Sequence, residues 1–257
     1  MNVLDAITNR RSIRAFRPDP VPKETLEQIL QIAQRSPSGT NTQPWHVYVC
    51  AGAVKQAITE DVLALVRSGG GKKYEDHDYY PADWKPEHRD RRRGVGWSLY
   101  SLLGIAKGDR VASARQGARN FQFFDAPVGL FVTTDAYLGR GSWADAGMYL
   151  QTLMLAAKGF GLDTCPQAAW IPVQEPVFRH LGIPSDQALV CGMALGYADP
   201  TKIENTLVSE REARARSPSF AGLIEPCAAQ LTNDGSYRAR LVGFAMPQRM
   251  NPGVCEN

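Results

Sequence analysis

The stretch from Ser36 to Trp45 constrains the fold most, because it cannot continue the helical pattern that precedes it. Pro37, Gly39 and Asn41 form turns, and an apolar, strand-like run from His46 to Cys50 follows directly. Taken alone, the stretch predicts a polar connector between a helix and a strand. It is unusually rich in side-chain hydrogen-bonding groups, which come from Ser38, Thr40, Asn41, Thr42 and Gln43.

Apolar periodicity predicts helices and strands on both sides of this connector. Over residues 22–34 the apolar side chains recur at i, i+3, i+4 and i+7 and form one stripe, made of Leu26, Ile29, Leu30 and Ala33. Ser142 is expected to cap a helix over residues 142–158, and residues 162–170 to form a proline-broken loop. Further helices are expected over 3–7, 54–67, 96–107, 109–120 and 175–181, and buried strands over 46–50, 126–134 and 188–196.

Composition excludes several classes of protein. The 257 residues carry 29 basic and 26 acidic side chains, and this net charge of +3 gives no field that would attract nucleic acid. The five cysteines are widely spaced and form no CxxC pair, which favours reduced thiols. No run approaches the roughly 20 apolar residues of a membrane span, and no signal-peptide pattern opens the chain. We therefore expect a soluble, cytoplasmic protein without nucleic-acid or membrane partners.

Two segments show no clear period. Residues 70–95 mix aromatic and charged side chains, and we expect them to form a lid-like insertion that sets substrate choice. Residues 213–257 form a C-terminal extension, and the sequence assigns it no role.

The usual catalytic signatures are absent from the sequence. Gly94-Val-Gly96 lacks the third glycine of a dinucleotide fingerprint, and there is no P-loop, HExxH or G-x-S-x-G motif. The four histidines show no metal-ligand spacing, so no metal site is expected. A protein that delegates its chemistry to a cofactor needs binding groups more than catalytic ones, and this pattern favours such a protein.

The cluster Arg10-Arg11-Ser12-Ile13-Arg14 is one candidate binding group. Two adjacent guanidinium groups can clamp a phosphate, and Ser12 can bind a neighbouring polyol. Arg14 would reach farther along the same ligand. The alternative is a solvated basic turn at a helix C-terminus, where the helix dipole favours arginine.

Three ordered motifs together resemble the FMN-dependent nitroreductase family. They are Arg10-Arg-Ser-Ile-Arg14-Ala-Phe-Arg-Pro18, Ser36-Pro-Ser-Gly-Thr-Asn-Thr-Gln-Pro-Trp45 and Thr164-Cys-Pro-Gln-Ala-Ala169. The resemblance also includes residues 120–128 and 205–211, and it implies an FMN-binding domain over residues 1–212. The implied fold is α+β, with a central, mostly antiparallel sheet flanked by helices. The implied assembly is an interlocked homodimer with two FMN sites at the subunit interface.

The resemblance also implies roles for individual residues. Arg10 and Arg11 would hold the FMN phosphate, Ser12 the phosphate and ribityl end, and Arg14 the pyrimidine edge of the flavin. A fixed cation at that edge stabilises the negative charge that reduced flavin develops at N1 and the C2 carbonyl. The partner's flavin would be contacted by Pro37, Ser38, Asn41 and Gln43. Backbone amides would reach flavin N5 and O4 from the loop formed by Pro166, Gln167 and Ala168, and Arg211 would return to the phosphate.

The implied activity is reduction of nitroaromatic, or similarly electron-poor aromatic or quinone, compounds by NADPH or NADH through a ping-pong hydride transfer at flavin N5. Oxygen-dependent flavin fragmentation and reductive dehalogenation use a similar site. A flavin-binding protein without turnover is the alternative from another class. Stacking favours aromatic side chains in a pocket for planar ligands. The candidates for its wall are Tyr79, Tyr80, Trp84, Phe123 and Phe124.

Overall fold

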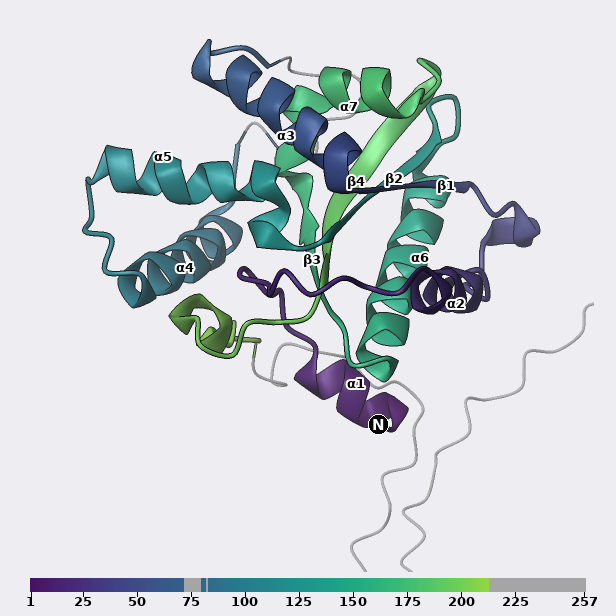
Figure 1. Cartoon of the computed structure of the whole chain (residues 1–257), viewed down its shortest axis with the longest axis horizontal. Coiled ribbons are helices and arrows are strands. Elements are labelled where there is room, and N and C mark those ends of the chain that lie inside the picture. The colour runs from purple at the N-terminus through teal and green to yellow at the C-terminus, as the bar shows by residue number, and fades with distance from the viewer. Residues whose placement is uncertain (72–79, 82, 213–257) are drawn as a thin grey trace, which may run out of the picture. The chain divides into compact units, whose positions relative to one another are not determined.

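The centre of the fold is a four-stranded sheet in which every neighbouring pair of strands is antiparallel (Figure 1). The strand order is β1-β2-β4-β3, so β1 and β3 are the edge strands. The bounds are Trp45–Ala51 for β1, Val128–Asp135 for β2, Asp163–Gln167 for β3 and Gln187–Gly196 for β4. The expected α+β class, with a mostly antiparallel sheet flanked by helices, is confirmed.

This computed structural model describes residues 1–71, 80–81 and 83–212. The chain divides into two units, residues 1–210 and residues 211–257. The sheet and all the elements below belong to the first unit. Among the described residues, none of the helices combines the length and apolar character that a bilayer crossing requires.

Helices cover both faces of the sheet. Helices α2 (Lys23–Ala33) and α6 (Arg140–Gly159) share one hydrophobic core with the sheet, and α3 (Gly52–Arg67) and α7 (Gln174–Leu181) share the other. The remaining helices lie around this three-layer body in Figure 1. They are α1 (Val3–Asn9), α4 (Pro86–Leu102) and α5 (Arg110–Ala118). The short 3-10 helices are η1 (Gly39–Asn41), η3 (Arg119–Asp125), η4 (Ala168–Val173) and η5 (Ile203–Thr206).

Two glycines let aromatic rings lie directly on the central strands. A Cβ on Gly129 of β2 would stand 2.4 Å from the Phe123 ring, and one on Gly192 of β4 would stand 2.3 Å from the Trp170 ring. The two rings lie beside each other, with centroids 4.6 Å apart. This pair is fully buried and forms the middle of the core on the α3 and α7 side.

Most predicted elements are confirmed, and three predictions are wrong. Residues 163–167 form a strand rather than a loop, since the edge position of β3 tolerates Pro166. Helix α6 begins at Arg140 with Gly139 as its N-cap, so Ser142 lies inside the helix. Helix α4 begins ten residues before the expected start at Gly96, because Pro86 opens it. It buries no residue and so shows no apolar stripe in the sequence.

Candidate functional site

The arginine cluster runs along the outer edge of β3. Ser12 forms a parallel bridge with Thr164, and the Ile13 amide donates to the Thr164 carbonyl at 3.1 Å. Successive residues of an extended segment point to opposite faces, so Ser12 and Arg14 lie opposite the buried Ile13. The sheet itself therefore fixes the direction of these two polar side chains.

Asn205 holds the next part of this segment through two hydrogen bonds and makes a third to Asp199. Its carboxamide oxygen accepts from the Arg14 amide at 2.9 Å. Its Nδ2 donates to the Ala15 carbonyl at 2.8 Å and to the Asp199 carbonyl at 2.9 Å. The buried Asn205 side chain thus fixes the backbone that carries Arg14. Asn205 lies in one of the motifs, but the sequence indicates no role for it, because two of its three partners are backbone groups about 190 residues away.

An ion pair anchors the turn that carries Asn205. Arg119 Nη1 lies 2.6 Å from the carboxylate of Glu204, which is only 5% exposed, and Arg119 Nη2 lies 2.9 Å from Asp125. A buried carboxylate is costly without a partner, so this pair fixes η5 in place. No sequence pattern predicts the pair of Arg119 and Glu204, because its members lie 85 residues apart.

Among the residues that the structure describes, no carboxylate pairs with the guanidinium groups of the cluster. Within the described chain, Arg10, Arg11 and Arg14 form no ion pair, and the bond that Arg14 Nη1 makes is to the Ser12 carbonyl, at 3.1 Å. Burial raises the pKa of the Cys165 thiol to about 11 against the opposing charges of Arg14 and Arg10, so both cations lie near this strand. Arg10 and Arg14, together with the adjacent Arg11, give this segment a positive charge that favours an anionic ligand.

A buried hydroxyl completes the donor set at this edge. The Thr164 Oγ1 has no hydrogen-bond partner among the described residues, although Thr164 is buried. Buried polar groups usually have partners, so this hydroxyl is available to a polyol or phosphate. The available donors and the three cations fit the phosphate and ribityl chain of FMN.

The predicted flavin-contacting residues Pro166, Gln167 and Ala168 follow along the same strand. The side chain of Gln167 is used internally, since its Nε2 donates to the Asn120 carbonyl at 2.6 Å and its Oε1 faces Trp170 Nε1 at 3.4 Å. Pro166 and Ala168 are partly exposed. The structure therefore brings this segment and the arginine cluster together on β3, and it leaves backbone groups rather than the Gln167 side chain for a ligand.

The connector 36–44 is held by a carboxylate that sequence analysis missed. Both oxygens of Asp145, a buried residue of α6, lie 3.2 Å from the Gly39 amide. The Ser38 hydroxyl accepts from the Gln43 amide at 2.9 Å. Thr40, Asn41 and Gln43 have φ angles of 49°, 60° and 49°, in the left-handed region that non-glycine residues rarely occupy. Such strain is typical of functional loops.

The connector and the arginine cluster lie at diagonally opposite corners of the sheet. Ser12, Thr164, Leu195, Val128 and Ala51 form one row across the strands. The connector ends at Trp45, six residues along β1 from that row. Strand geometry puts the two polar clusters about 20 Å apart along the strands and about 19 Å apart across them. Within one chain they do not form a single site.

The substrate-wall candidates fall into three groups. Phe123 and Phe124 lie in the hydrophobic core, so the expectation that they line an open pocket is wrong. The Phe123 ring packs against Gly129, and the Phe124 ring lies under the Arg119 guanidinium. Tyr80 and Trp84 lie together before α4, with the Arg92 guanidinium 5.1 Å and 5.2 Å from their ring centroids. Tyr79 lies outside the described residues. Arg211 belongs to the second unit, and its role stays a prediction.

Comparisons with known proteins identify the family. A profile of the nitroreductase family matches residues 7–197. The chain is 38% identical over 216 residues to 4-nitrobenzoate reductase from Pseudomonas putida, covering 84% of this chain and 94% of that protein. It is 39% identical over 204 residues to nitrobenzene nitroreductase from Ectopseudomonas oleovorans, covering 79% and 89%. The chain therefore belongs to the nitroreductase family, as its motifs predict.

A solved structure gives the same result for the fold. The FMN and NADPH-dependent nitroreductase NfnB from Sphigopyxis sp. strain HMH matches with a TM-score of 0.84 at 37% identity. The match covers 87% of this chain and 100% of that one.

Proposed function

We propose that this chain is an FMN-dependent reductase that uses NADPH or NADH to reduce nitroaromatic compounds. The observation that carries the proposal is the segment 10–14 along the edge of β3, whose three arginines form no ion pair within the described chain. The relatives support it, because they are reductases of 4-nitrobenzoate and nitrobenzene, and NfnB is FMN and NADPH-dependent. Bound FMN would supply the hydride chemistry.

The residues of the chain bind and orient the cofactor. Arg10 and Arg11 neutralise the phosphate, and Ser12 binds the phosphate and ribityl end beside the Thr164 hydroxyl. Arg14 places a fixed positive charge at the pyrimidine edge, where reduction puts negative charge. Asn205 holds Arg14 at that position through the backbone. The backbone of Pro166, Gln167 and Ala168 faces the reactive side of the ring.

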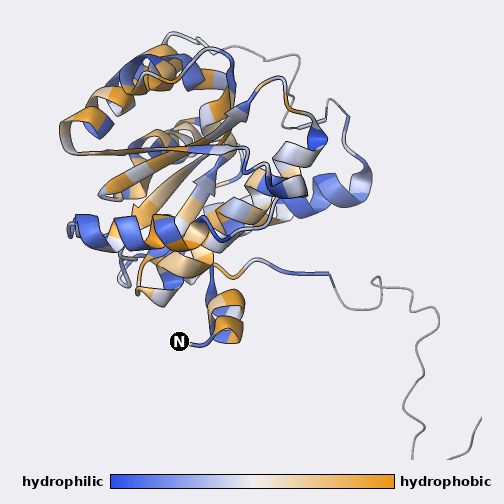
Figure 2. Cartoon of the chain, turned by 90° about the vertical axis from the view of Figure 1, so that its right-hand side faces the viewer, coloured by the Kyte–Doolittle hydropathy of each residue, from blue (hydrophilic) through white to orange (hydrophobic). Residues whose placement is uncertain are grey.

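We further propose a homodimer in which each site takes residues from both chains. The diagonal separation of the two polar clusters supports it, because Pro37, Ser38, Asn41 and Gln43 would serve a flavin held by the arginines of the partner. Helix α1 also needs a cover, since Val3, Leu4 and Ile7 are 64%, 69% and 49% exposed (Figure 2). We propose that a second copy of the chain covers this apolar face of α1.

The cytoplasmic location remains a prediction from the cysteine pattern.

Acceptor choice is assigned to the segment before and at the start of α4. Tyr80 and Trp84 offer rings for planar acceptors, and Arg92 fixes them by cation–π contact. Because residues 86–95 are part of α4, a deletion that probes the insertion should stop before Pro86. Removal of residues 72–84 is expected to change the range of acceptors and to leave FMN bound. Loss of flavin from this variant would contradict the assignment.

The function is tested by anaerobic spectroscopy of the purified protein. We expect a yellow protein that bleaches with NADPH or NADH and regains its colour when 4-nitrobenzoate or nitrobenzene is added. Failure to bleach with either nicotinamide would favour a flavin-binding protein without turnover. Recolouring in air with irreversible loss of flavin would favour flavin fragmentation.

Two further experiments test the flavin site and the assembly. An Arg10→Met, Arg11→Met double variant should purify colourless but folded. Ultracentrifugation should give a dimer for the unmodified chain.

A further inference from the structure

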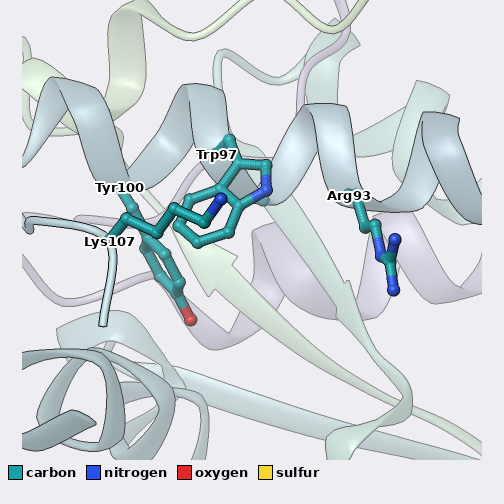
Figure 3. A pocket seen from close by; sticks show the side chains of 5 residues that line it. Arg93, Trp97, Tyr100 and Lys107 are labelled. Atoms are coloured by element: carbon teal, nitrogen blue, oxygen red, sulfur yellow. The ribbon is translucent and has the colours of Figure 1, made fainter. Parts of the chain in front are cut away.

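A second candidate site lies on α4, outside the proposed flavin site. Arg93, Gly96, Trp97 and Tyr100 recur at i, i+3, i+4 and i+7 and so share one face of the helix. Together with Lys107 they line a cavity of about 500 Å³ (Figure 3). Helix α4 also packs against η5, the turn that carries Asn205.

The cavity combines aromatic surface with positive charge. Trp97 is 43% exposed, and the Tyr100 ring meets it edge-on, with centroids 6.3 Å apart and planes at 80°. Lys107 lies across the indole in Figure 3, with its Nζ 5.7 Å from the ring centroid. Among the described residues, those that line the cavity include no carboxylate. Within the described residues, neither Arg93 nor Lys107 forms an ion pair.

The floor of the cavity is kept open by Gly96. A Cβ built on this residue would meet no atom within 4 Å. Glycine weakens a helix interior relative to residues with a side chain, and here no close approach of another element requires it. A larger side chain at position 96 would instead project into the cavity beside Trp97.

We propose that this cavity binds a planar aromatic ring that carries an anionic group. The ring would stack on Trp97 and meet the edge of Tyr100, since aromatic pairs prefer offset-stacked or edge-to-face contacts. Lys107 covers the indole by a cation–π contact, and an incoming ring would replace the cation on that face. The displaced ammonium group would then pair with the anion of the ligand, and Arg93 adds positive charge at the cavity rim.

The proposed reductase uses two compounds that carry an aromatic ring and an anionic group, and their assignment to this cavity rests on the proposed function. One is an aromatic acid used as acceptor, and the other is the adenosine phosphate end of the nicotinamide donor. Binding itself does not depend on turnover. Benzoate and adenosine 2′,5′-bisphosphate are suitable probes for the two sources, with benzamide and adenosine as their neutral counterparts.

Isothermal titration calorimetry on the full-length protein, purified with its flavin, tests the proposal. We expect at least one anionic probe to bind more tightly than its neutral counterpart. Its affinity should fall about tenfold in Lys107→Met, which removes the ammonium group that pairs with the anion. It should also fall about tenfold in Trp97→Ala, which removes the ring on which the probe stacks. Lys23→Met, which removes an exposed cation on α2, is the matched control and should bind like the unmodified protein.

The Gly96→Leu variant gives the sharpest test. It removes no contact, favours the helix, and fills the cavity, so binding should be lost while the thermal unfolding temperature is kept. Binding of benzoate alone would identify the aromatic acid, and binding of the bisphosphate alone the nucleotide. The proposal is overturned if neither anionic probe binds below about 10 mM. It is also overturned if Gly96→Leu binds the probe as the unmodified chain does.

Discussion

The arginine cluster and the connector 36–44 are both assigned to flavin binding, yet their own chain holds them in different ways. The arginine segment is part of the sheet edge and is fixed by Thr164 and by two hydrogen bonds of Asn205. The connector is exposed over most of its length and is tied to the body mainly through Asp145. The arginine half of the site is therefore held in place within a single chain, whereas the connector half is exposed on the surface of its own chain.

The backbone strain of the connector sharpens this difference. Three of its non-glycine residues have positive φ, and such conformations cost on the order of 1–3 kcal/mol each. Strain of this kind persists where surrounding contacts over-determine it. A flavin and a partner subunit would supply contacts that the single chain lacks. Changes in the arginine half should therefore affect both folding and flavin binding, and changes in the connector should affect flavin binding alone.

The largest effect is expected from Asn205→Ala. The change removes three hydrogen bonds, and a lost hydrogen bond costs about 0.5–1.5 kcal/mol. Among the described residues, the Arg14 amide is left without an acceptor, which costs about 1–3 kcal/mol, whereas the Ala15 carbonyl keeps the Asp199 amide at 3.0 Å and the Asp199 carbonyl keeps the Lys202 amide at 3.4 Å. We expect the free energy of unfolding to fall by about 3 kcal/mol and FMN to bind about 100-fold more weakly. Urea unfolding of the flavin-free protein and fluorescence titration with FMN measure the two quantities.

Thr206→Val is the control within the same turn. Within the described part of the chain, the Thr206 hydroxyl bonds only to the Ile203 carbonyl. Its loss should therefore change the free energy of unfolding and the FMN affinity little. If Asn205→Ala bound FMN like the unmodified chain, the position of Arg14 would not depend on this clamp.

A smaller effect is expected from Asp145→Ala. The Gly39 amide loses its acceptor, and the connector is no longer tied to α6. We expect FMN to bind about tenfold more weakly, which corresponds to about 1.4 kcal/mol, with little change in the stability of the flavin-free protein. Asp145→Asn keeps an acceptor oxygen and should bind FMN nearly as well as the parent. A large loss of stability in Asp145→Ala would remove the contrast between the two halves.

Asn41→Ala should weaken flavin retention several-fold without unfolding the protein. Asn41 has φ 60°, where alanine costs about 1–2 kcal/mol, so the substitution removes a side chain and adds strain. Asn41→Gly removes the side chain without the strain and separates the two causes. We expect both variants to lose flavin on gel filtration, alanine more than glycine. Unchanged flavin content in both would make the segment a simple polar connector.

The sequence predicts the local part of this architecture and misses the long-range part. The apolar stripe of α2 and the strands β2 and β4 follow from periodicity, because each signal lies within one short segment. Edge strand β3 is missed, since five residues that include Pro166 carry too weak a pattern. Among the site residues, the motifs identify the arginines, but Asp145 and Asn205 act on backbone groups more than 100 residues away. No spacing rule reaches that far.

Aromatic residues show the same limit. Gly129 and a backbone hydrogen bond from the Phe16 amide place Phe123 and Phe124 in the core. Neither contact falls at the spacing of a helix or strand repeat, so apolar periodicity does not predict it. Trp97 belongs to a helix without buried residues, so its face produces no amphipathic signal.

The smallest effect concerns the turn that supports Ala15 and Asn205. The Thr201 hydroxyl donates to Asp199 at 2.6 Å and its amide donates at 2.9 Å, and these bonds lower the pKa of the Asp199 carboxyl below its usual value. A lowered pKa in the folded state contributes stability above the unfolded pKa near 3.8, and this stability is lost as the pH falls through the folded pKa.

Thr201→Val removes the hydroxyl and should bring the pKa of Asp199 closer to 3.8. The unfolding temperature of the variant should therefore lie slightly below that of the parent near pH 6, and the part of this difference that comes from Asp199 should vanish as the pH falls below the folded pKa of Asp199. Thermal unfolding across this range measures it, with Thr152→Val on α6 as a matched control that should show a pH-independent difference. A difference for Thr201→Val that grew on acidification would contradict the sign. Because Asp199 is exposed, this contribution stays well below that of Asn205, and the turn supports the arginine half mainly through its backbone carbonyl.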